Sequence, residues 1–393
     1  MVMMMHRAHK TRLYVNNKQG SLLLQCCGAS RFAYNTCLAK WNDDYASDDQ
    51  VRHNRFSIKK WFNHWKVENA PWTYSYSKWI YEAAIQDLAS GFDRFFKGQC
   101  GHPKFHKRGT RESFRIDGSV VKLDGKSLRL PKGITLKMAE QLRFDISKIY
   151  NVTVSLEAGK WYVSINCEVL DRPRESQSGA VGIDMGLKEL ATLSDGYVVD
   201  NPRCYKKMER RLAHLQRKLA RQKKYSNNYK KTKLRIARLH KRIADKRKDH
   251  HHKATTAIAG KYGVVFLEDL NVVGMAKNRS LAKAVQDAGM SLFVEQLGYK
   301  TKAVKIDRWY PSSKTCSCCG HVKPMPLNLR IYECPSCGMV MDRDMNAAVN
   351  ILNVGMANYS ELMPVEGDNH RTRSLGEAFD EAGIQRQFLR RIA

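Results

Sequence analysis

The chain has 393 residues, with 68 Lys and Arg against 38 Asp and Glu, so its formal net charge is +30 at pH 7. Hydrophobic residues make up 43% of it, which suits about one to three compact domains with buried cores. No apolar run is long enough to span a bilayer and the N-terminus lacks the apolar stretch of a signal peptide, so we expect neither a membrane-spanning nor a secreted protein. A polyanion would relieve the self-repulsion of this charge; nucleic acid is the first candidate and an anionic membrane surface a distant second.

The first part of the chain passes from a strand to helices and back to strands. Residues 8–15 predict a strand, and the pattern from about 19 to 108 is helical and aromatic. From 110 to 170 apolar residues alternate, with Asp-Gly and Ala-Gly pairs typical of hairpin turns. We therefore expect a small β-domain interrupted by a helical insertion. The polar residues 171–179 predict a linker.

Three short strands are predicted in succession within residues 179–201, followed by two long helices at 204–250 with a break near Ser226. Apolar residues recur at helical spacing on both helices, which predicts one packed seam and a basic outer face. The seam residues are Leu212, Leu215, Leu219, Ile236, Leu239 and Ile243.

This helical hairpin carries an unusual excess of positive charge: between Asn201 and Lys253 there are 21 Lys or Arg and three acidic residues. A charged run is more often a solvated face than a binding site. The excess here favours contact with nucleic-acid phosphates, which releases counterions. The candidate contacts are Lys10 and Arg12 on the first strand and, on the hairpin, Arg210, Arg211, Arg217, Lys218, Arg221, Lys224, Arg235, Arg238 and Arg242.

The last third predicts a strand at 263–270, a helix from Leu281 to about Lys302, a strand at 304–311 and a helix starting near Met341. Residues from Ala357 onward are mixed and polar, and we expect a weakly ordered tail there.

Four of the eleven cysteines have a spacing of their own: Cys316, Cys319, Cys334 and Cys337 form two C-x-x-C turns, fourteen residues apart and each followed by Gly. The two-residue gap lets both thiolates of a turn face one tetrahedral ion, so the pattern predicts a structural Zn²⁺ ribbon. Cys318 lies inside the first turn but matches no partner. The absence of a secretory signal favours a reducing cytosol, in which the other cysteines would be small buried apolar residues: Cys26, Cys27, Cys37, Cys100, Cys167 and Cys204.

Three carboxylates lie at strand or helix ends: Asp184 in an apolar strand, Glu268 at the end of another, and Asp344 at the start of a helix. A buried carboxylate is unfavourable unless it is paired or binds metal, so three converging acids predict a site for two Mg²⁺ that could clamp a phosphodiester. The order of strands and helices is that of an RNase H-like nuclease core. Glu268, rather than Asp269, continues the inward phase of its strand. Asp342 and Asp344 stay unresolved at this point, because either could stabilise a helix N-terminus without metal.

Several segments resemble a known family: GIDMGLKELATLSDG, VVFLEDLNVVGMAKN, DRWYPSSKTCSCCG and CPSCGMVMDRDMNAAVNIL. They are similar to the three RuvC motifs and the zinc ribbon of the TnpB (OrfB) proteins, which insertion sequences encode and which are related to compact type V CRISPR effectors. Residues 9–38 and 364–386 resemble the same family, so the likeness covers nearly the whole chain. The chain departs from the pattern at Val15, where the family usually has proline, and in a shorter link before the strand at 304–311.

The resemblance implies a multidomain α/β fold with an RNase H-like (RuvC) core, an inserted zinc ribbon, a split barrel-like wedge domain and a helical recognition lobe. Its catalytic acids, which hold two Mg²⁺, fall on Asp184, Glu268 and, by analogy alone, Asp344, and its Zn²⁺ ligands fall on the four cysteines of the C-x-x-C turns. The implied division is 1–18 and 109–172 for the wedge, 19–108 for the recognition lobe, 180–310 and 340–356 for the core, 311–339 for the ribbon and 357–393 for the tail.

The function implied by the resemblance is an RNA-guided DNA endonuclease in the cytoplasm of a prokaryote, associated with the nucleoid. Its partners would be a guide RNA from the end of the element and a double-stranded DNA target with a short adjacent motif; a monomer and a dimer are both open. Two alternatives remain: a regulator of transposition or expression that does not cut, and a transposase that transfers DNA strands. A regulator would be expected to have lost one of the acids, and all three are present here.

Overall fold

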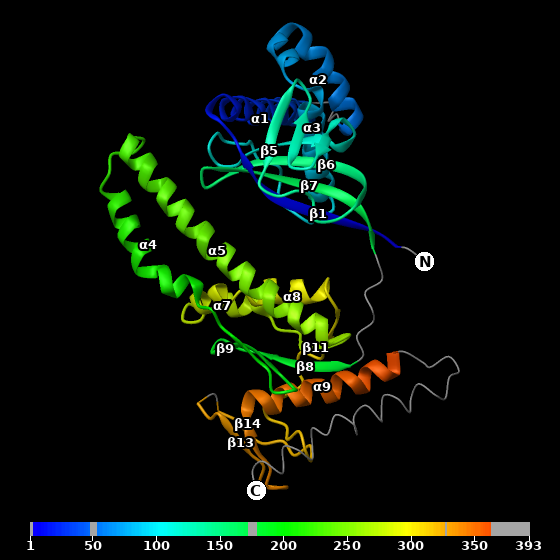
Figure 1. Ribbon diagram of the computed structural model, residues 1–393, viewed down its shortest axis with the longest axis vertical. Coiled ribbons are helices and arrows are strands. Elements are labelled where there is room, and N and C mark those ends of the chain that lie inside the picture. Colours follow the sequence, from blue (N-terminus) through cyan, green and yellow to red (C-terminus); the bar gives the residue numbers. More distant parts are fainter. Residues whose placement is uncertain (1–2, 48–52, 172–178, 327, 363–393) are drawn as a thin grey trace. The chain divides into compact units, whose positions relative to one another are not determined.

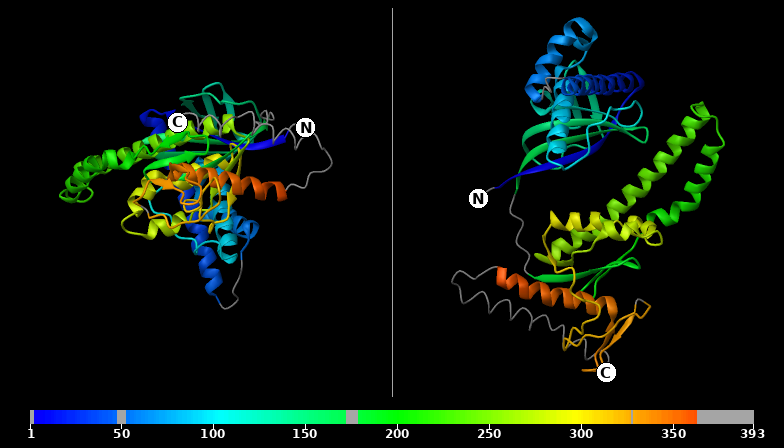
Figure 2. Two further views of the ribbon diagram at one scale, coloured as in Figure 1. Left: turned by 90° about the horizontal axis from the view of Figure 1, so that it is seen from below. Right: turned by 180° about the vertical axis from the view of Figure 1, so that it is seen from behind.

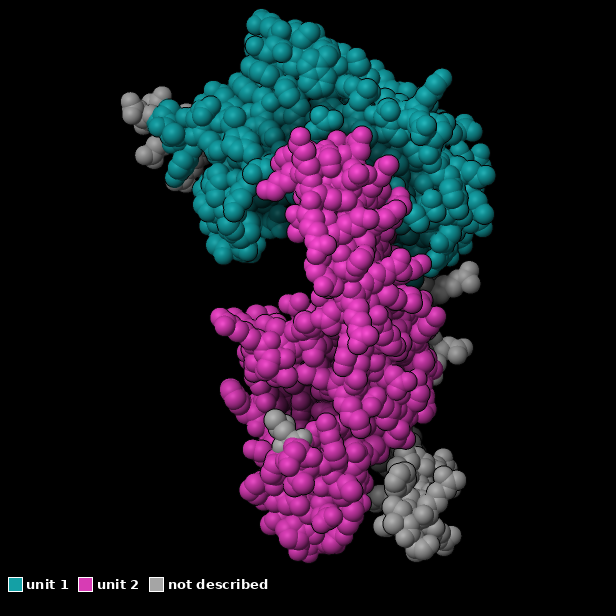
Figure 3. Space-filling view, turned by 90° about the vertical axis from the view of Figure 1, so that its left-hand side faces the viewer, with its two compact units in different colours: residues 1–174 teal, residues 175–393 magenta. Residues whose placement is uncertain are grey.

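The structure is a computed structural model that describes residues 3–47, 53–171, 179–326 and 328–362. It divides into two compact units, residues 1–174 and 175–393 (Figure 3). None of the helices in the described ranges combines the length and apolar character that a membrane crossing requires. Most of the linker expected at 171–179 lies outside these ranges.

The first unit contains a seven-stranded sheet in the order β2-β6-β7-β1-β5-β4-β3, with every neighbouring pair antiparallel. The N-terminal strand therefore lies inside a sheet whose other strands all follow the helices, so the helical segment interrupts the β-structure. Alternate residues of the long strands, such as Val152, Val154 and Val163, point into the core. The strands are β1 (Met3–Tyr14), β2 (Glu112–Asp117), β3 (Lys122–Asp124), β4 (Ser127–Leu130), β5 (Ile134–Met138), β6 (Ile146–Glu157) and β7 (Lys160–Asp171).

Three helices follow β1: α1 (Asn17–Ala46), α2 (Arg55–Asn69) and α3 (Lys78–Phe96) (Figure 1). A capping box of Asn16 and Gln19 begins α1. Aromatic side chains of the three helices pack in one core, in which Trp41 stacks on Phe92 with ring centroids 4.2 Å apart. The helical pattern expected up to residue 108 ends at Phe96, because the following segment is rich in Gly, His and Pro.

The second unit is built on a five-stranded sheet in the order β10-β9-β8-β11-β12. The first three strands are antiparallel, whereas β8, β11 and β12 are parallel. Helices α5 and α8 cover one face and α9 covers the other (Figures 1 and 2). The strands are β8 (Ala180–Met185), β9 (Glu189–Leu193), β10 (Val198–Asp200), β11 (Val264–Glu268) and β12 (Lys302–Ile306).

The basic hairpin consists of α4 (Cys204–Ala220) and α5 (Asn227–Lys261), which pack side by side (Figure 1). Five of the six expected seam residues join its apolar cluster, and Leu219 is half-buried. Helix α5 runs beyond the expected end at residue 250, because its last turns are apolar and pack on the sheet through Ala254 and Ile258.

The single helix expected from Leu281 to Lys302 is wrong. The segment forms α7 (Ala282–Ala288) and α8 (Met290–Gly298), after the short α6 (Val272–Lys277). Gly289 separates α7 from α8 with φ +67°, a left-handed conformation that interrupts an α-helix. It also lies close to Arg247 of α5, where a Cβ would come within 2.8 Å of the Arg247 side chain.

The last described elements are the hairpin of β13 (Ile331–Glu333) and β14 (Val340–Asp342) and the long helix α9 (Arg343–Leu362). The weakly ordered tail expected from Ala357 is therefore wrong for residues 357–362, which continue α9; residues 363–393 lie outside the described ranges.

Helix α9 crosses β8 at Gly182. A Cβ at this position would lie 2.2 Å from the carbonyl oxygen of Ala348 and 2.5 Å from the backbone nitrogen of Leu352. Both are backbone atoms of α9 and cannot turn away, so the strand and helix approach each other this closely only with glycine here.

We predict that Gly182→Ala lowers the free energy of unfolding by about 1–3 kcal/mol or more, because α9 must move away from the sheet. Urea denaturation followed by circular dichroism measures the change. The matched control is Gly260→Ala in α5, where a Cβ meets nothing within 4 Å; stability there should stay the same or rise slightly. Equal stability of both variants would contradict the packing argument.

Candidate active site and cysteine cluster

Two of the three candidate acids lie on neighbouring strands and on one face of the sheet. Ile183 of β8 pairs with Leu267 of β11, so Asp184 and Glu268 are the next residues on two parallel strands. Residues of β11 alternate between the two faces: Val265 and Leu267 join the core with α5 and α8, whereas Phe266 packs on the α9 side. Asp184 and Glu268 therefore lie at the carboxyl ends of their strands on the face that α9 covers.

The third acid, Asp344, lies in the first turn of α9. Asp342, the alternative from the sequence, acts as a helix cap: its Oδ1 accepts the backbone N–H groups of Asp344 and Met345 at 2.9 and 3.1 Å. The two aspartates therefore have different surroundings, since Asp342 is exposed and Asp344 is half-buried.

The charges of these acids act on one another. The pKa of Asp184 is raised to about 8, first because its carboxylate is desolvated and then because Glu268 and Asp344 repel its negative charge. Arg343 partly offsets this rise. Asp342 also raises this pKa, by a smaller effect. The charges of Glu268, Asp344 and Asp342 thus act on Asp184 from positions at least 84 residues further along the sequence.

Each of the other two acids has a protein partner. The Ser312 hydroxyl donates to Glu268 Oε1. Asp344 pairs with two arginines: Arg330 Nη1 lies 3.2 Å from its Oδ2, and the Nε and Nη2 atoms of Arg343 each lie 3.1 Å from its Oδ1. Glu268 and Asp344 are thus held in defined orientations beside Asp184.

Asp269, next to Glu268, faces other partners. Its carboxylate pairs with Lys305, at 2.8 Å, and with Arg308. Hydrogen bonds from these cations hold the pKa of Asp269 below its usual range. Of the two adjacent acids, Glu268 is the one that acts on Asp184.

The four cysteines of the C-x-x-C turns form a compact cluster. Their sulfur atoms all lie within 4.8 Å of one another, close enough to hold one metal ion. Among the described residues, the carboxylates of Asp184, Glu268 and Asp344 do not meet this distance. Sγ of Cys316 lies 3.7 Å from Sγ of Cys337, and Sγ of Cys319 lies 3.5 Å from Sγ of Cys334. A tetrahedral ion with Zn–S bonds of about 2.3 Å requires sulfur atoms about 3.8 Å apart, so the cluster fits Zn²⁺.

The turns behind the cysteines have matching geometry. Gly320 and Gly338 have φ of +75° and +72°, and each N–H bonds at 3.0 Å to the carbonyl of the first cysteine of its turn. This left-handed conformation explains the glycine after each C-x-x-C turn. Cys318 is exposed and lies outside the cluster.

Two buried asparagines of α9 attach the segment around the first C-x-x-C turn to this helix, and the sequence analysis did not identify either of them. Asn346 donates to the carbonyl of Thr315 at 2.7 Å and accepts the N–H of Ser317 at 2.9 Å. Asn350 donates to the carbonyls of Ser312 and Thr315 at 2.8 and 2.7 Å. Two asparagines at i, i+4 on an otherwise apolar helix face are the sequence pattern that could have identified them.

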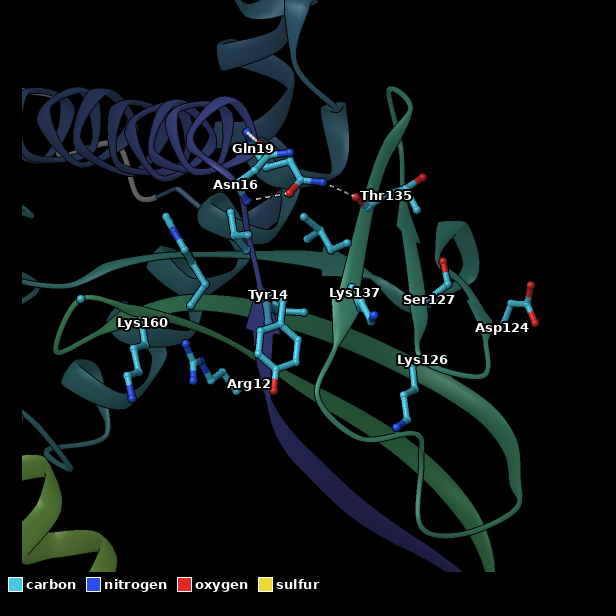
Figure 4. A pocket seen from close by; sticks show the side chains of 15 residues that line it. Arg12, Tyr14, Asn16, Gln19, Asp124, Lys126, Ser127, Thr135, Lys137 and Lys160 are labelled. Carbon is cyan, nitrogen blue, oxygen red and sulfur yellow. Dashed lines mark hydrogen bonds between the residues drawn. The ribbon is translucent and has the colours of Figure 1, made fainter.

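The candidate nucleic-acid contacts are all exposed, and those of the hairpin lie on its outer surface. On β1, Lys10 pairs with Glu157 and Arg12 lines a pocket (Figure 4). The sequence reasoning missed Tyr225 at the hairpin tip, which is 81% exposed with φ +67°. It also missed the buried Asp287, which accepts the N–H groups of Tyr205 and Lys206 at the start of α4.

Comparisons with known proteins define the class of the chain. Family models match residues 153–279 (OrfB_IS605, a probable transposase), 291–351 (the TNB domain of Cas12f1-like proteins) and 3–50 (a helix-turn-helix domain of OrfB_IS605). In the last range the described residues form strand β1 and one long helix, α1, instead of two helices joined by a turn. These matches define a transposase-related protein of the insertion-sequence type.

Similar proteins then identify the family. A putative RNA-guided DNA endonuclease of Streptomyces pristinaespiralis is 35% identical over 370 residues, which cover 91% of each chain. The putative RNA-guided DNA endonuclease InsQ of Escherichia coli K12 is 32% identical over 89% of this chain and 92% of its own. The chain therefore belongs to the OrfB (TnpB) family, as its motifs predicted.

A solved structure shares the fold. The Cas12f1–sgRNA–target DNA complex, determined by cryo-electron microscopy, contains a chain that matches with a TM-score of 0.51 at 14% identity, over 89% of this chain and 99% of its own. The mixed α/β architecture expected from the sequence is confirmed at this level.

We predict that Cys319→Ser abolishes stoichiometric zinc in the purified protein, because three thiolates no longer complete a tetrahedral site. Elemental analysis by mass spectrometry measures the zinc content. Cys318→Ser is the matched control, since this neighbouring thiol lies outside the cluster, and it should retain one equivalent. Loss of zinc from Cys318→Ser alone would reverse the assignment.

Proposed function

We propose that the chain is an RNA-guided DNA endonuclease whose cleavage site consists of Asp184, Glu268 and Asp344. The observation that carries the proposal is that Asp184 and Glu268 end two neighbouring parallel strands, with Asp344 near enough that burial and the charges of Glu268 and Asp344 raise the pKa of Asp184. The strand order β10-β9-β8-β11-β12 fits an RNase H-like, or RuvC, core. The names of the two similar bacterial proteins support the same activity.

The donor chemistry of the site suits Mg²⁺. Carboxylate oxygens are the ligands this ion prefers, and a divalent cation would relieve the repulsion that raises the pKa of Asp184. When bound, two such ions activate water and stabilise the charge that develops on the leaving oxygen of the phosphodiester. Structural Zn²⁺ would be held by Cys316, Cys319, Cys334 and Cys337.

In this proposal, the residues around the acids hold them in position and pair with phosphate. Ser312 orients the carboxylate of Glu268 through its hydroxyl. Arg330 and Arg343 hold Asp344 in position and bring two guanidinium groups next to the site, where they can pair with phosphate. The basic hairpin provides an exposed surface for RNA or for the paired strands, whose sequence is read by base pairing and not by side chains.

The division into domains is also part of the proposal. Residues 1–18 and 109–172 form the wedge, 19–108 the recognition lobe, and 180–310 with 340–356 the nuclease core. The seven-stranded antiparallel sheet supports the first of these, since β1 joins strands that follow the helices.

We predict that Asp184→Asn, purified with its RNA, binds target DNA with unchanged affinity and loses cleavage by a factor of about 10³ or more, because the central metal ligand is gone. Asp269→Asn is the matched control: it removes a carboxylate that pairs with Lys305 and Arg308 and should cut normally. Cleavage of a labelled target duplex is followed on denaturing gels. Undiminished cutting by Asp184→Asn would refute the site, and joined DNA ends in the wild-type products would indicate a transposase instead.

A second pair of variants separates the two aspartates that begin α9. Asp344→Asn should lose cleavage to a similar degree. Asp342→Asn should keep it, because asparagine caps a helix as well as aspartate does. The same gel assay compares the two rates, and thermal unfolding checks that both variants fold. The opposite order of rates would assign the catalytic role to Asp342.

A further inference from the structure

A pocket opens in the first unit where β1 changes its partner strand. Arg12 still pairs with Tyr162 of β7, whereas Leu13 already pairs with Met138 of β5. The two parts of the sheet diverge here and leave an open cavity of about 880 Å³, which the end of β1 helps to line (Figure 4). This volume lies within the range of about 300–1,000 Å³ found for ligand pockets.

The lining of this pocket is cationic. Arg12, Lys126, Lys137 and Lys160 line it, together with a single acid, Asp124. All four cations are exposed, and Asp124 has its own partner, Arg129, at 3.8 Å. A ligand that enters the pocket is therefore expected to be anionic.

An aromatic ring lies at the centre of the cations. Tyr14 is 51% exposed, and the Arg12 guanidinium lies 5.2 Å from its ring centroid. Its cross-strand neighbour is Lys137. In Figure 4, Tyr14 lies between Arg12 and Lys160 on one side and Lys126 and Lys137 on the other. The exposure of the ring leaves room for a planar group to stack on it.

The helix that starts beside the pocket does not provide the anion site. The side chain of Asn16 accepts the N–H of Gln19 at 2.8 Å, and Gln19 returns a bond to the N–H of Asn16 at 3.0 Å. The side-chain amide of Gln19 also donates to the carbonyl of Thr135 at 2.8 Å. Binding must therefore rest on the aromatic ring and the side-chain cations.

These features select among anionic ligands. A small inorganic anion would use the cations and leave the exposed ring without a role. A duplex buries its base faces within its own stack, so it cannot stack on a ring in the wall of a pocket. An unpaired nucleotide uses both features, because its base stacks on an aromatic face and its phosphates pair with neighbouring cations.

We propose that this pocket binds an unpaired nucleotide of a single-stranded nucleic acid, with its base on Tyr14 and its flanking phosphates near Lys137 and Lys160. The inference rests on the proposed function in taking nucleic acid as the ligand. RNA and DNA share the required chemistry, and the half-buried hydroxyl of Ser127 in the lining offers a contact for a ribose 2′-OH.

The test measures binding of the full chain, freed of co-purified RNA, to labelled RNA and DNA oligonucleotides of one sequence and about 12 nucleotides. Tyr14→Ala should weaken binding of at least one of them about tenfold, and Tyr14→Trp should restore it. Lys137→Gln should reduce the slope of log affinity against log salt by about 0.7, the value for one phosphate contact on a single strand. A 2-aminopurine base in the oligonucleotide should lose its stacking-dependent quenching in Tyr14→Ala.

The matched control is Tyr45→Ala, which removes a tyrosine of the same unit that is 46% exposed and lies outside the pocket; it should bind like the wild type. A Tyr14 effect on RNA alone, on DNA alone or on both supports the pocket and identifies the strand. Wild-type affinity and quenching of both oligonucleotides in Tyr14→Ala overturn the proposal. The readout is binding, so a chain that cuts no DNA but depends on Tyr14 would refute the nuclease function and leave the pocket standing.

Discussion

The close crossing of α9 over β8 at Gly182 is the contact on which the acidic site depends. The helix runs opposite to the strand (Figures 1 and 2). Asp344 lies four residues before Ala348 and eight before Leu352, about 6 to 12 Å along the helix, and Asp184 lies two residues after Gly182, about 6.6 Å along the strand. Both acids are therefore displaced from the crossing in the same direction. A bulkier residue at Gly182 would change the separation of the acids without touching either of them.

The same helix connects the acids to the cysteine cluster. Asn346 and Asn350 follow Asp344 at intervals of two and six residues and bond to the backbone of the segment that leads into the first C-x-x-C turn. Ser312, in that segment, donates to Glu268. A metal in the cysteine cluster would thus stiffen a loop that contacts Glu268 and that is bonded to the helix carrying Asp344. These bonds lie in the interior, where an unpaired amide or carbonyl is costly, so they also fix the position of the loop.

The sequence alone predicts features that depend only on residues close together in the chain. Period-two alternation selected Glu268 over Asp269, and the cysteine spacing selected the four clustered thiols, which the structure groups. Asp342 and Asp344 could not be separated, because either suits the start of a helix and only the packing of α9 distinguishes them. The break at Gly289 is a left-handed turn that packs close to Arg247, forty-two residues away, and a lone glycine in a helical pattern does not by itself specify such a turn. The pocket at Tyr14 was missed because it arises where one strand pairs with two others that follow much later in the chain.

The basic side chains form ion pairs with some acids of the second unit but do not offset the charge of Asp184. Asp269 and Asp344 each have two cationic partners within salt-bridge distance, which offset the charges of these carboxylates. Asp184 receives longer-range relief from Arg343, which is smaller than the combined effect of desolvation and of the other acids, and its pKa rises to about 8. The divalent cation proposed for this site would lower that pKa again, because it would stabilise the charged carboxylate. The surplus of 30 positive charges therefore does not offset the repulsion at Asp184, on the central strand of the sheet.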